Sequence, residues 1–349
     1  MGKNNPLTLP SPPVGGRGLK VRGAKKMKKS GNNNNLVVLG GNSNPDLLRE
    51  ICSFLNIPQG KAEVGRFPEG EIRVQIQQNI RGRDVFIVQS TSTPANDHLM
   101  ELLILIDAAR RASARRITAV LPFFGYARQD RKDKPRVPIT AKLVANLVTT
   151  AGANRVLAMD LHAGQIQGFF DIPVDHLYSI NVVGDYFRKK KLKNLVVVSP
   201  DVGGLKMARA YSKFLHASLA IVDKRRESDR ETHVMHIIGE VKGRNVLIVD
   251  DMISTGGSLV EAIQALKKEG VQDVYAAVVH PVLADPAVKR LQSSGLKELV
   301  VTNSIPLPRE KSIPQIKMLS VARLLAEAIE RIHSNESVSS LFSQAGVEA

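Results

Sequence analysis

The chain has 349 residues, of which 43% are apolar, and it carries a formal net charge of +16. This length and apolar content can fill the cores of two domains of ordinary size, so we expect a globular protein. The longest aliphatic run near the middle, residues 102–106, is too short to span a bilayer and no signal-peptide pattern opens the chain, which excludes a membrane partner and predicts a soluble, cytoplasmic protein.

The positive charge is concentrated at the start of the chain, which argues against nucleic acid as the main ligand. Residues 1–35 contain eight basic residues and no acidic one, so they account for half of the +16. Aromatic residues make up only 4% of the chain, which leaves few rings on which bases could stack. The remaining surplus charge is better suited to a polyphosphate substrate.

Residues 1–35 are rich in Pro, Gly, Lys and Asn and lack apolar periodicity, so we expect a disordered basic tail. An organelle transit peptide is an alternative, but the segment has two serines, two arginines and no amphipathic pattern. We therefore favour a dispensable extension that arises from an upstream start codon, with Met27 as the true start. The single cysteine, Cys52, shares an apolar helical spacing with Leu48, Ile51 and Leu55, which indicates a core thiol in a reducing compartment.

From Leu36 onward, short apolar runs alternate with stretches of helical periodicity, the pattern of a mainly parallel α/β sheet. The expected strands are LVVLG, DVFIVQ, ITAVLPFF, RVLAMD, NLVVVS, LAIVD, VLIVD, DVYAAVV and ELVV, and the expected helices include residues 96–113, 139–152, 203–217 and 321–333. Nine strands exceed one compact sheet of usual size, so we divide the chain near Leu177. The sequence thus predicts an N-terminal α/β domain over residues 36–176, a C-terminal α/β domain over residues 177–317, and a helix and tail over residues 318–349 that pack back on the first domain.

The segment NVLIVDDMISTGGSL, residues 245–259, combines a buried strand, two carboxylates and a loop of hydroxyls and glycines before a helical pattern. A Gly-Gly turn at a helix N-terminus points backbone amides into one small volume, and Ser254, Thr255 and Ser258 add donors, so this loop is a candidate phosphate cradle. Asp250 and Asp251 would accept hydrogen bonds from sugar hydroxyls or hold a shared divalent cation. The segment therefore predicts a site for a phosphorylated sugar, and the alternative is a solvated Asp-Asp turn.

Further polar residues follow other expected strands, where ligands bind in open α/β sheets. They lie in SPDVGG (Asp201, Gly203, Gly204), in a long polar loop DKRRESDRETH (Lys224, Arg225, Arg226), in DLHAGQ (Asp160, His162) and in PFFGYARQDRKDKPR (Arg128, Gln129, Arg131, Lys132, Asp133, Arg136). A charge run is usually solvated surface, but one beside two anion cradles would close over a polyphosphate as a mobile lid. Taken alone, His162 fits a hydrogen-bonded structural histidine or a zinc ligand better than a magnesium ligand, because Mg²⁺ prefers oxygen, but no partners with zinc spacing surround it.

Over residues 36–343 the chain resembles class I ribose-phosphate diphosphokinase, also called phosphoribosyl pyrophosphate synthetase. The resemblance rests on FPEGEIRVQI, NDHLMELLILIDA, PFFGYARQDRKDKPR, DLHAGQIQGFFDIPVDHLY, VVVSPDVGG, DKRR, VDDMISTGGS and VVHPVLADPAV in that order. It implies two similar phosphoribosyltransferase-type α/β domains, each with a mainly parallel central sheet flanked by helices. It also implies transfer of the diphosphoryl group of ATP to the C1 hydroxyl of ribose 5-phosphate, with Mg²⁺, releasing AMP and phosphoribosyl pyrophosphate for nucleotide biosynthesis.

The resemblance assigns roles to the motif residues. Ribose 5-phosphate would be bound by Asp250, Asp251, Ser254, Thr255, Gly256, Gly257 and Ser258, and the diphosphate by Asp201, Gly203 and Gly204. ATP would be contacted by Phe67, Glu69, Glu71, Arg128, Gln129, Asp133 and His162, with His162 and Asp201 at the metal. Lys224 and Arg226 match the mobile catalytic loop, and Arg225 between them is expected to point away.

The resemblance also implies regulation and assembly. Phe67, Glu69 and Glu71 would reach the ATP of a neighbouring subunit, which implies a homo-oligomer, commonly a hexamer. Inorganic phosphate and ADP would act as effectors at a site lined by Arg136, Gln167, Asp175, Ser337 and Ser339. Two departures from the usual pattern, Ser254 where many members carry Asp and Glu69 where Asp or Asn is usual, would alter affinity without abolishing activity.

Two rival functions belong to other classes. A type I phosphoribosyltransferase would share the 250–258 loop, but it would normally be a single shorter domain without DLHAGQIQGFF. A non-catalytic subunit associated with a synthetase would be an interaction protein, against which the intact His162, Lys224 and Arg226 argue.

Overall fold

The computed structural model describes residues 35–226 and 233–343. The expected basic tail and the end of the expected C-terminal tail lie outside these residues. The first half of the described chain forms a five-stranded parallel sheet in the order β1-β4-β5-β6-β7. Its strands are β1 (Leu36–Gly40), β4 (Asp84–Val88), β5 (Arg116–Leu121), β6 (Arg155–Met159) and β7 (Val174–Leu177).

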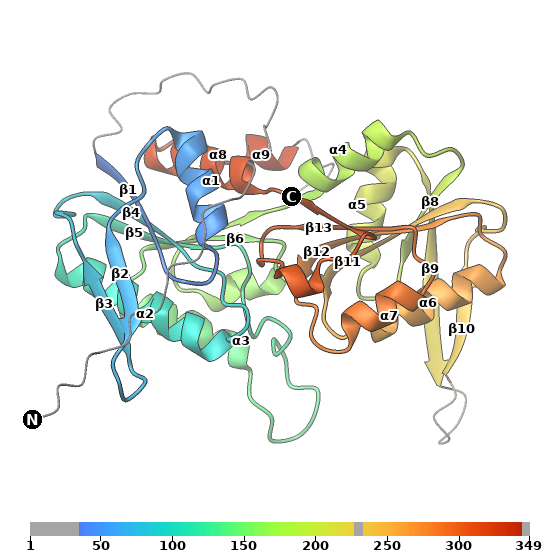
Figure 1. Cartoon of the computed structure of the whole chain (residues 1–349), viewed down its shortest axis with the longest axis horizontal. Helices are drawn as coiled ribbons and strands as arrows, with labels where there is room; N and C mark the ends of the chain where they lie inside the picture. The colour runs from blue at the N-terminus through green and yellow to red at the C-terminus, as the bar shows by residue number, and fades with distance from the viewer. Residues whose placement is uncertain (1–34, 227–232, 344–349) are drawn as a thin grey trace, which may run out of the picture.

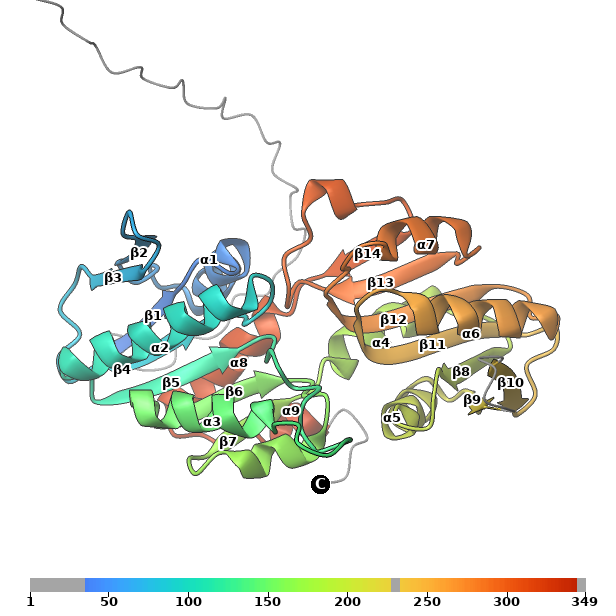
Figure 2. The same ribbon diagram turned by 90° about the horizontal axis from the view of Figure 1, so that it is seen from below.

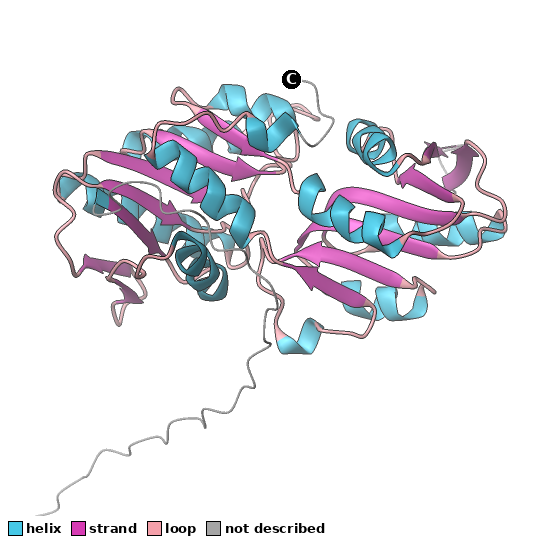
Figure 3. Ribbon diagram, turned by 90° about the horizontal axis from the view of Figure 1, so that it is seen from above, coloured by secondary structure: helices cyan, strands magenta, loops and turns pink. Residues whose placement is uncertain are grey.

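Helices cover both faces of this first sheet, as Figure 3 shows. Alternate residues of β1 point to opposite cores, with Val37 and Leu39 in one and Leu36 and Val38 in the other. The first core is closed by α2 (Ala95–Arg111) and α3 (Thr140–Ala151), and the second by α1 (Pro45–Leu55) and α8 (Ala322–His333). This double burial explains why the strands read as continuous apolar runs.

The second half forms a seven-stranded sheet in the order β10-β9-β8-β11-β12-β13-β14, in which only the β9–β10 pair is antiparallel. Its strands are β8 (Leu195–Ser199), β9 (Ser218–Arg226), β10 (His233–Ile238), β11 (Asn245–Ile253), β12 (Val274–Pro281), β13 (Glu298–Thr302) and β14 (Ile316–Leu319). One core contains α6 (Gly257–Lys268) and α7 (Ala287–Ser293), and the other contains α4 (Ile180–Lys190) and α5 (Leu205–Leu215). The two sheets stand side by side in Figure 1.

The C-terminal helix α8 returns to the first sheet and packs against α1 (Figure 1). Its last residue, His333, places Nδ1 2.8 Å from Oδ2 of Asp84, which also forms an ion pair with Arg116. Arg116 donates a second hydrogen bond to the carbonyl of Ile332 at 2.9 Å. A largely buried carboxylate therefore fixes the end of α8 to strands β4 and β5.

Buried hydrogen bonds join the two halves where their strands end. Ser90 Oγ donates to the carbonyl of Ser304 at 2.6 Å, and Asn44 Nδ2 donates to the carbonyl of Asn303 at 2.8 Å. The His280 ring bonds the Asp160 carbonyl through Nε2 at 3.1 Å. Because both donors and acceptors are buried, these bonds specify how the halves meet.

The α/β fold with mainly parallel sheets confirms the expected fold class. The nine expected strands are present, but the count is wrong because the described residues contain five more, namely β2 (Ala62–Arg66), β3 (Ile72–Ile76), β7, β10 and β14. Those in the hairpin β2–β3 are only half-buried, so they lack the apolar runs that marked the others. The remaining described helical segments are η2 (Gly164–Phe169), η3 (Arg309–Lys311) and α9 (Ser340–Ser343). Among the described residues, no helix combines the length and apolar character needed to cross a membrane.

The prediction that a long polar loop begins directly after Asp223 is also wrong, because β9 extends to Arg226. The backbone of residues 224–226 continues β9, with Lys224 opposite Met235 and Arg226 opposite His233 on β10. Backbone pairing within this antiparallel ribbon overrides the polar sequence. Residues 227–232, and the side chains of residues 224–234, lie outside the description.

Candidate active site

The phosphate-cradle candidate lies at the end of β11. The strand runs to Ile253, so Asp250 and Asp251 lie within it rather than after it. Helix α6 follows with Gly256 as its N-cap, at φ 72°, and within the described chain no side chain caps its first amides. The left-handed φ explains the glycine, and the uncapped amides leave donors for an anion.

A second loop of the same kind follows β8, the neighbour of β11 in the sheet. Oδ1 of Asp201 accepts a hydrogen bond from the Gly204 amide at 2.9 Å, which closes the turn before α5. A Cβ at Gly204 would lie 2.8 Å from Ser199 Oγ, so the close approach requires glycine. Since β8 and β11 are parallel, the two loops adjoin at the same edge of the sheet.

His162 comes from the first half of the chain and meets the second half at Asp251. Its Nδ1 lies 2.6 Å from Asp251 Oδ2. The hydrogen bond to Asp251 raises the pKa of His162, outweighing burial. Burial alone would raise the pKa of Asp251, but the hydrogen bond and charge of His162 lower it. The raised pKa of His162 and the lowered pKa of Asp251 are the two effects of a single ion pair.

Carboxylates are crowded next to this ion pair. Burial, followed by the charge of Asp251, raises the pKa of Asp250 well above its ordinary value, and Asp201 adds to the effect. Burial also raises the pKa of Asp160 to about 7. Crowded oxygen ligands of this type fit Mg²⁺, which binds one or two carboxylates and completes its shell with water and phosphate oxygens. The described residues contain no cluster of three or more His, Cys, Asp or Glu placed to hold a metal ion.

A cavity of about 430 Å³ opens beside the ion pair, between the loop after β5 and strand β11. It is lined by Phe123, Tyr126, Ala127, Arg128, Gln129 and Met252. Gln165, in η2 just after His162, donates to Asp130 at 2.9 Å and so holds the loop after β5 near His162. The structure thus places Arg128 and Gln129 in the cavity wall, with Met252, the neighbour of Asp251, in the same wall.

Other predicted residues lie elsewhere. Phe67, Glu69 and Glu71 occupy the exposed turn of the β2–β3 hairpin, which Figure 2 shows on the side of the first sheet away from the second half. They do not line the cavity. Asp133 is exposed farther along the loop after β5. Only the backbone of Lys224 and Arg226 is described, on β9.

The predicted effector residues make local contacts in this chain. Asp175 on β7 pairs with Arg155, and Gln167 donates to the Gly164 carbonyl. Ser337 Oγ accepts the Ser339 amide at 3.1 Å. Arg136 is exposed and has a positive φ of 62°. These contacts leave the effector role a prediction.

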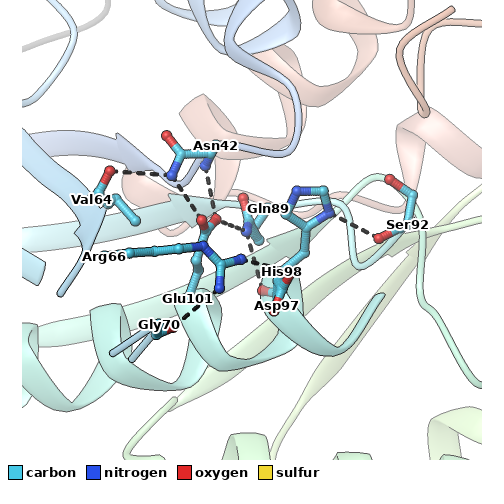
Figure 4. A network of polar contacts seen from close by, with 9 residues as sticks. All are labelled: Asn42, Val64, Arg66, Gly70, Gln89, Ser92, Asp97, His98 and Glu101. Carbon is cyan, nitrogen blue, oxygen red and sulfur yellow. Dashed lines mark hydrogen bonds and ion pairs between the residues drawn. The ribbon is translucent and has the colours of Figure 1, made fainter. Parts of the chain in front are cut away.

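Sequence reasoning missed the cavity lining from Phe123, Tyr126 and Met252 and the direct His162–Asp251 contact. It also missed a polar network around Glu101 (Figure 4). The only available signal was that NDHLMELLILIDA places a glutamate among apolar helical positions.

Comparisons with known proteins agree with this geometry. Residues 36–152 match the N-terminal domain of ribose phosphate pyrophosphokinase, and residues 227–343 match the phosphoribosyl synthetase-associated domain. A ribose-phosphate pyrophosphokinase from Rhizobium meliloti is 60% identical over 87% of this chain and 99% of its own length. One from Bacillus caldolyticus is 56% identical over 86% of this chain and 96% of its own. The crystal structure of phosphoribosylpyrophosphate synthetase from Mycobacterium smegmatis matches with a TM-score of 0.83 at 42% identity, covering 86% of this chain and 99% of that one.

The parallel first sheet and the mainly parallel second sheet, with glycine N-caps after β8 and β11 of the second, define an α/β protein of phosphoribosyltransferase type with two halves. The chain belongs to the ribose-phosphate pyrophosphokinase family.

Proposed function

We propose that the protein transfers the diphosphoryl group of ATP to the C1 hydroxyl of ribose 5-phosphate, giving phosphoribosyl pyrophosphate and AMP. The observation that carries this proposal is the contact between His162 and Asp251. It joins the sugar-phosphate candidate in the second half to the nucleotide candidate in the first, so that two substrates can meet. A protein that bound only a sugar phosphate would not need the nucleotide candidate site in the first half.

Ribose 5-phosphate is held at the end of β11. The free amides and hydroxyls of residues 254–258 bind its phosphate, and the N-terminus of α6 favours the negative charge. Asp250 and Asp251 accept hydrogen bonds from the ribose hydroxyls. The substrate thereby lies with its sugar beside the ion pair.

ATP is held on the facing side. Arg128 and Gln129 line the cavity and bind base and phosphates, Asp133 contributes from the same loop, and His162 faces the phosphates. Phe67, Glu69 and Glu71 complete the ATP site of a neighbouring subunit, in a homo-oligomer that we propose to be a hexamer. The exposure of Phe67, at 43%, supports a partner at this turn.

The transferred group lies between the two substrates. The loop Asp201–Gly204 receives the diphosphate, and Lys224 and Arg226 stabilise the charge that builds up at the β-phosphorus during in-line transfer. The C1 oxygen forms the new bond to phosphorus as the bond to the AMP oxygen breaks, so no covalent enzyme intermediate is needed.

Mg²⁺ would be held near Asp201 and His162 with the phosphates, and it supplies neutralisation of phosphate charge when bound. Asp201, Asp250 and Asp251 lie close enough for their charges to add to the effect of burial on the pKa of Asp250, and a cation beside them would offset that charge. Inorganic phosphate and ADP are proposed effectors at Arg136, Gln167, Asp175, Ser337 and Ser339. A cytoplasmic location is also proposed, supported by the buried free thiol of Cys52.

One assay tests the proposal. The purified protein is incubated with ATP, Mg²⁺ and ribose 5-phosphate, and AMP and phosphoribosyl pyrophosphate are measured. Formation of both in equal amounts is expected. Consumption of added phosphoribosyl pyrophosphate with a free base would instead indicate a phosphoribosyltransferase, and absence of both reactions would indicate a non-catalytic subunit.

A further inference from the structure

The β2–β3 hairpin forms a two-stranded sheet of its own, and Ala62, Val64, Val74 and Ile76 pack its body against the first core. Polar side chains add directional contacts between the hairpin and the rest of the first half (Figure 4). The hairpin turn is closed by two backbone bonds, from the Phe67 amide to the Glu71 carbonyl at 2.8 Å and from the Gly70 amide to the Phe67 carbonyl at 2.9 Å. These bonds shape the turn but do not orient it. Its orientation depends on contacts outside the hairpin.

One such contact begins at Glu101 of α2, which is only 4% exposed. Its carboxylate accepts hydrogen bonds from the Asn42 amide at 2.9 Å, from Asn42 Nδ2 at 2.7 Å and from Gln89 Nε2 at 2.7 Å. Asn42 Nδ2 also donates to the carbonyl of Val64, on β2, at 3.2 Å. Glu101 therefore fixes the Asn42 amide group, which in turn holds the hairpin strand.

The base of the network is rigid. Gln89 also donates to the carbonyl of His98 at 3.1 Å, and His98 Nδ1 bonds the carbonyl of Ser92 at 2.8 Å. The first turns of α2 are thus tied to the end of β4. Since a buried carboxylate with three donors cannot lose one without cost, Glu101 has a single favourable arrangement.

The second contact is at the turn itself. Arg66, the residue before Phe67, donates through Nη1 to the Gly70 carbonyl at 3.1 Å. Its Nη2 lies 2.7 Å from Oδ2 of Asp97, in the first turn of α2. The side chains of Arg66 and Asp97 are 48% and 38% exposed, so this pair contributes little to stability but restricts where the turn points.

We propose that Glu101, through Asn42, and Arg66, through Asp97, are positioning residues that hold the hairpin turn in the orientation in which it meets ATP. This inference rests on the proposed function, because it takes residues 67–71 as the segment that contacts ATP. The reacting groups lie elsewhere, so these residues act on ATP binding and leave the chemical step alone.

The test compares Glu101→Gln and Arg66→Ala with wild type in the full chain. In Glu101→Gln, an NH2 group replaces one carboxylate oxygen and faces the hydrogen-bond donors of Asn42 and Gln89. Arg66→Ala removes the contacts of Arg66 with Gly70 and Asp97. The KM for ATP should rise about tenfold in the first variant and about fivefold in the second. The kcat and the KM for ribose 5-phosphate should stay within about twofold of wild type.

Two control variants isolate the orientation of the turn. Arg66→Lys can still pair with Asp97 and should restore most of the ATP affinity. Arg73→Ala removes an exposed ion pair with Glu63, which links the two strands of the same hairpin rather than the hairpin to α2, and should leave the KM for ATP unchanged. If Glu101→Gln does not fold, Arg66→Ala alone decides, because its ion pair is exposed.

Amide hydrogen exchange of residues 62–76 supplies a readout independent of turnover. Faster exchange in Glu101→Gln and Arg66→Ala than in Arg73→Ala is expected. An unchanged KM for ATP, an equal rise in both KM values, or a raised KM for ATP without faster exchange would each overturn the inference. Wild-type turnover tests the proposed function separately, because this inference depends only on the ratio of variant to wild-type constants.

Discussion

Nδ1 of His162 lies 2.6 Å from Oδ2 of Asp251, and this ion pair joins residues 89 positions apart from the two halves of the chain. His162 follows β6 of the first sheet and Asp251 lies in β11 of the second. The side chains are 36% and 15% exposed, so the pair is open on the histidine side and enclosed on the carboxylate side. A ligand of one residue therefore lies within reach of the other.

Replacing Asp251 by Asn should weaken ribose 5-phosphate more than ATP. A carboxylate that accepts hydrogen bonds from sugar hydroxyls contributes about 1.5 to 3 kcal/mol, so the Kd for ribose 5-phosphate should rise roughly 10- to 100-fold. Isothermal titration calorimetry with ribose 5-phosphate and with a non-hydrolysable ATP analogue measures both affinities.

The matched control is His162→Asn, which changes the other partner of the same ion pair. It should weaken the ATP analogue more than ribose 5-phosphate, giving the mirror-image pattern. If Asp251→Asn instead affects mainly the ATP analogue, the carboxylate belongs to the nucleotide side and its assignment to the sugar is wrong.

Gly256→Ala should impair the phosphate cradle through backbone strain alone. The nearest atoms to an added Cβ would lie 3.6 Å away, so there is room, but φ of 72° costs an alanine about 1 to 2 kcal/mol. The strained loop should lower the free energy of unfolding by about 1 kcal/mol and raise the KM for ribose 5-phosphate several-fold. Urea denaturation and steady-state kinetics measure the two effects.

Gly243→Ala provides the comparison, because Gly243 has a similar φ of 69° and open space around its Cβ position, and the turn is remote from the cradle. Gly243→Ala should lower the free energy of unfolding by a similar amount without changing the KM for ribose 5-phosphate. If Gly256→Ala and Gly243→Ala have the same KM for ribose 5-phosphate, the loop after β11 does not bind the 5-phosphate.

The sequence predicted the fold well where burial produces a strong pattern. Strands such as β4 and β11 are covered on both faces, so their apolar runs were unmistakable. The hairpin β2–β3 was not predicted because apolar and polar residues alternate in IRVQI and the strand is half-exposed. That period of two was nevertheless a usable strand signal. Lys224 and Arg226 were placed in a loop because polarity alone does not reveal an antiparallel ribbon.

In the candidate site, too, the sequence predicted motifs formed by neighbouring residues but not contacts between distant segments. The motif at the end of β11, residues 250–258, could be recognised from the sequence because its carboxylates, glycines and hydroxyls lie close together in the chain. The contact of His162 with Asp251 and the support of Val64 by Asn42 join distant segments, and their partners depend on how the halves and layers pack. Contacts of this kind need three-dimensional information.

Asp84→Asn should make stability less dependent on pH. Burial opposes ionisation of Asp84, but hydrogen bonds from His333 and Arg116 outweigh it and lower the folded-state pKa. Its stabilisation is therefore complete above the unfolded pKa of about 3.9 and is lost as pH falls through the lower folded value. Because the variant loses hydrogen bonds to a charged group, it should be about 2 kcal/mol less stable at pH 7, and the difference from wild type should shrink below about pH 4.

Urea denaturation at a series of pH values measures this difference. Asp107→Asn, which breaks an exposed ion pair with Arg111 on α2, should cost at most about 0.5 kcal/mol at any pH. A pH-independent loss in Asp84→Asn would show that packing at the end of α8, rather than the carboxylate charge, is what matters.

Lys224→Ala and Arg226→Ala should each reduce kcat sharply. A cation that stabilises the transition state of phosphoryl transfer contributes about 10³-fold, roughly 4 kcal/mol, and the ground-state complex gains little from it. The KM for each substrate should therefore shift only a few-fold. Steady-state kinetics at saturating Mg²⁺ gives kcat and both KM values for each variant.

Arg225→Ala is the internal control for this mechanism. Residues 224–226 continue strand β9, in which alternate positions belong to opposite faces, so positions 224 and 226 share a face that position 225 does not. If the cations act together on the β-phosphorus, Arg225→Ala should cost less than about tenfold in kcat. A strand that bears a solvated charge run would instead give equal, small losses in all three variants. A loss confined to Arg225→Ala would place the opposite face of β9 toward the substrates and would overturn the assignment of Lys224 and Arg226.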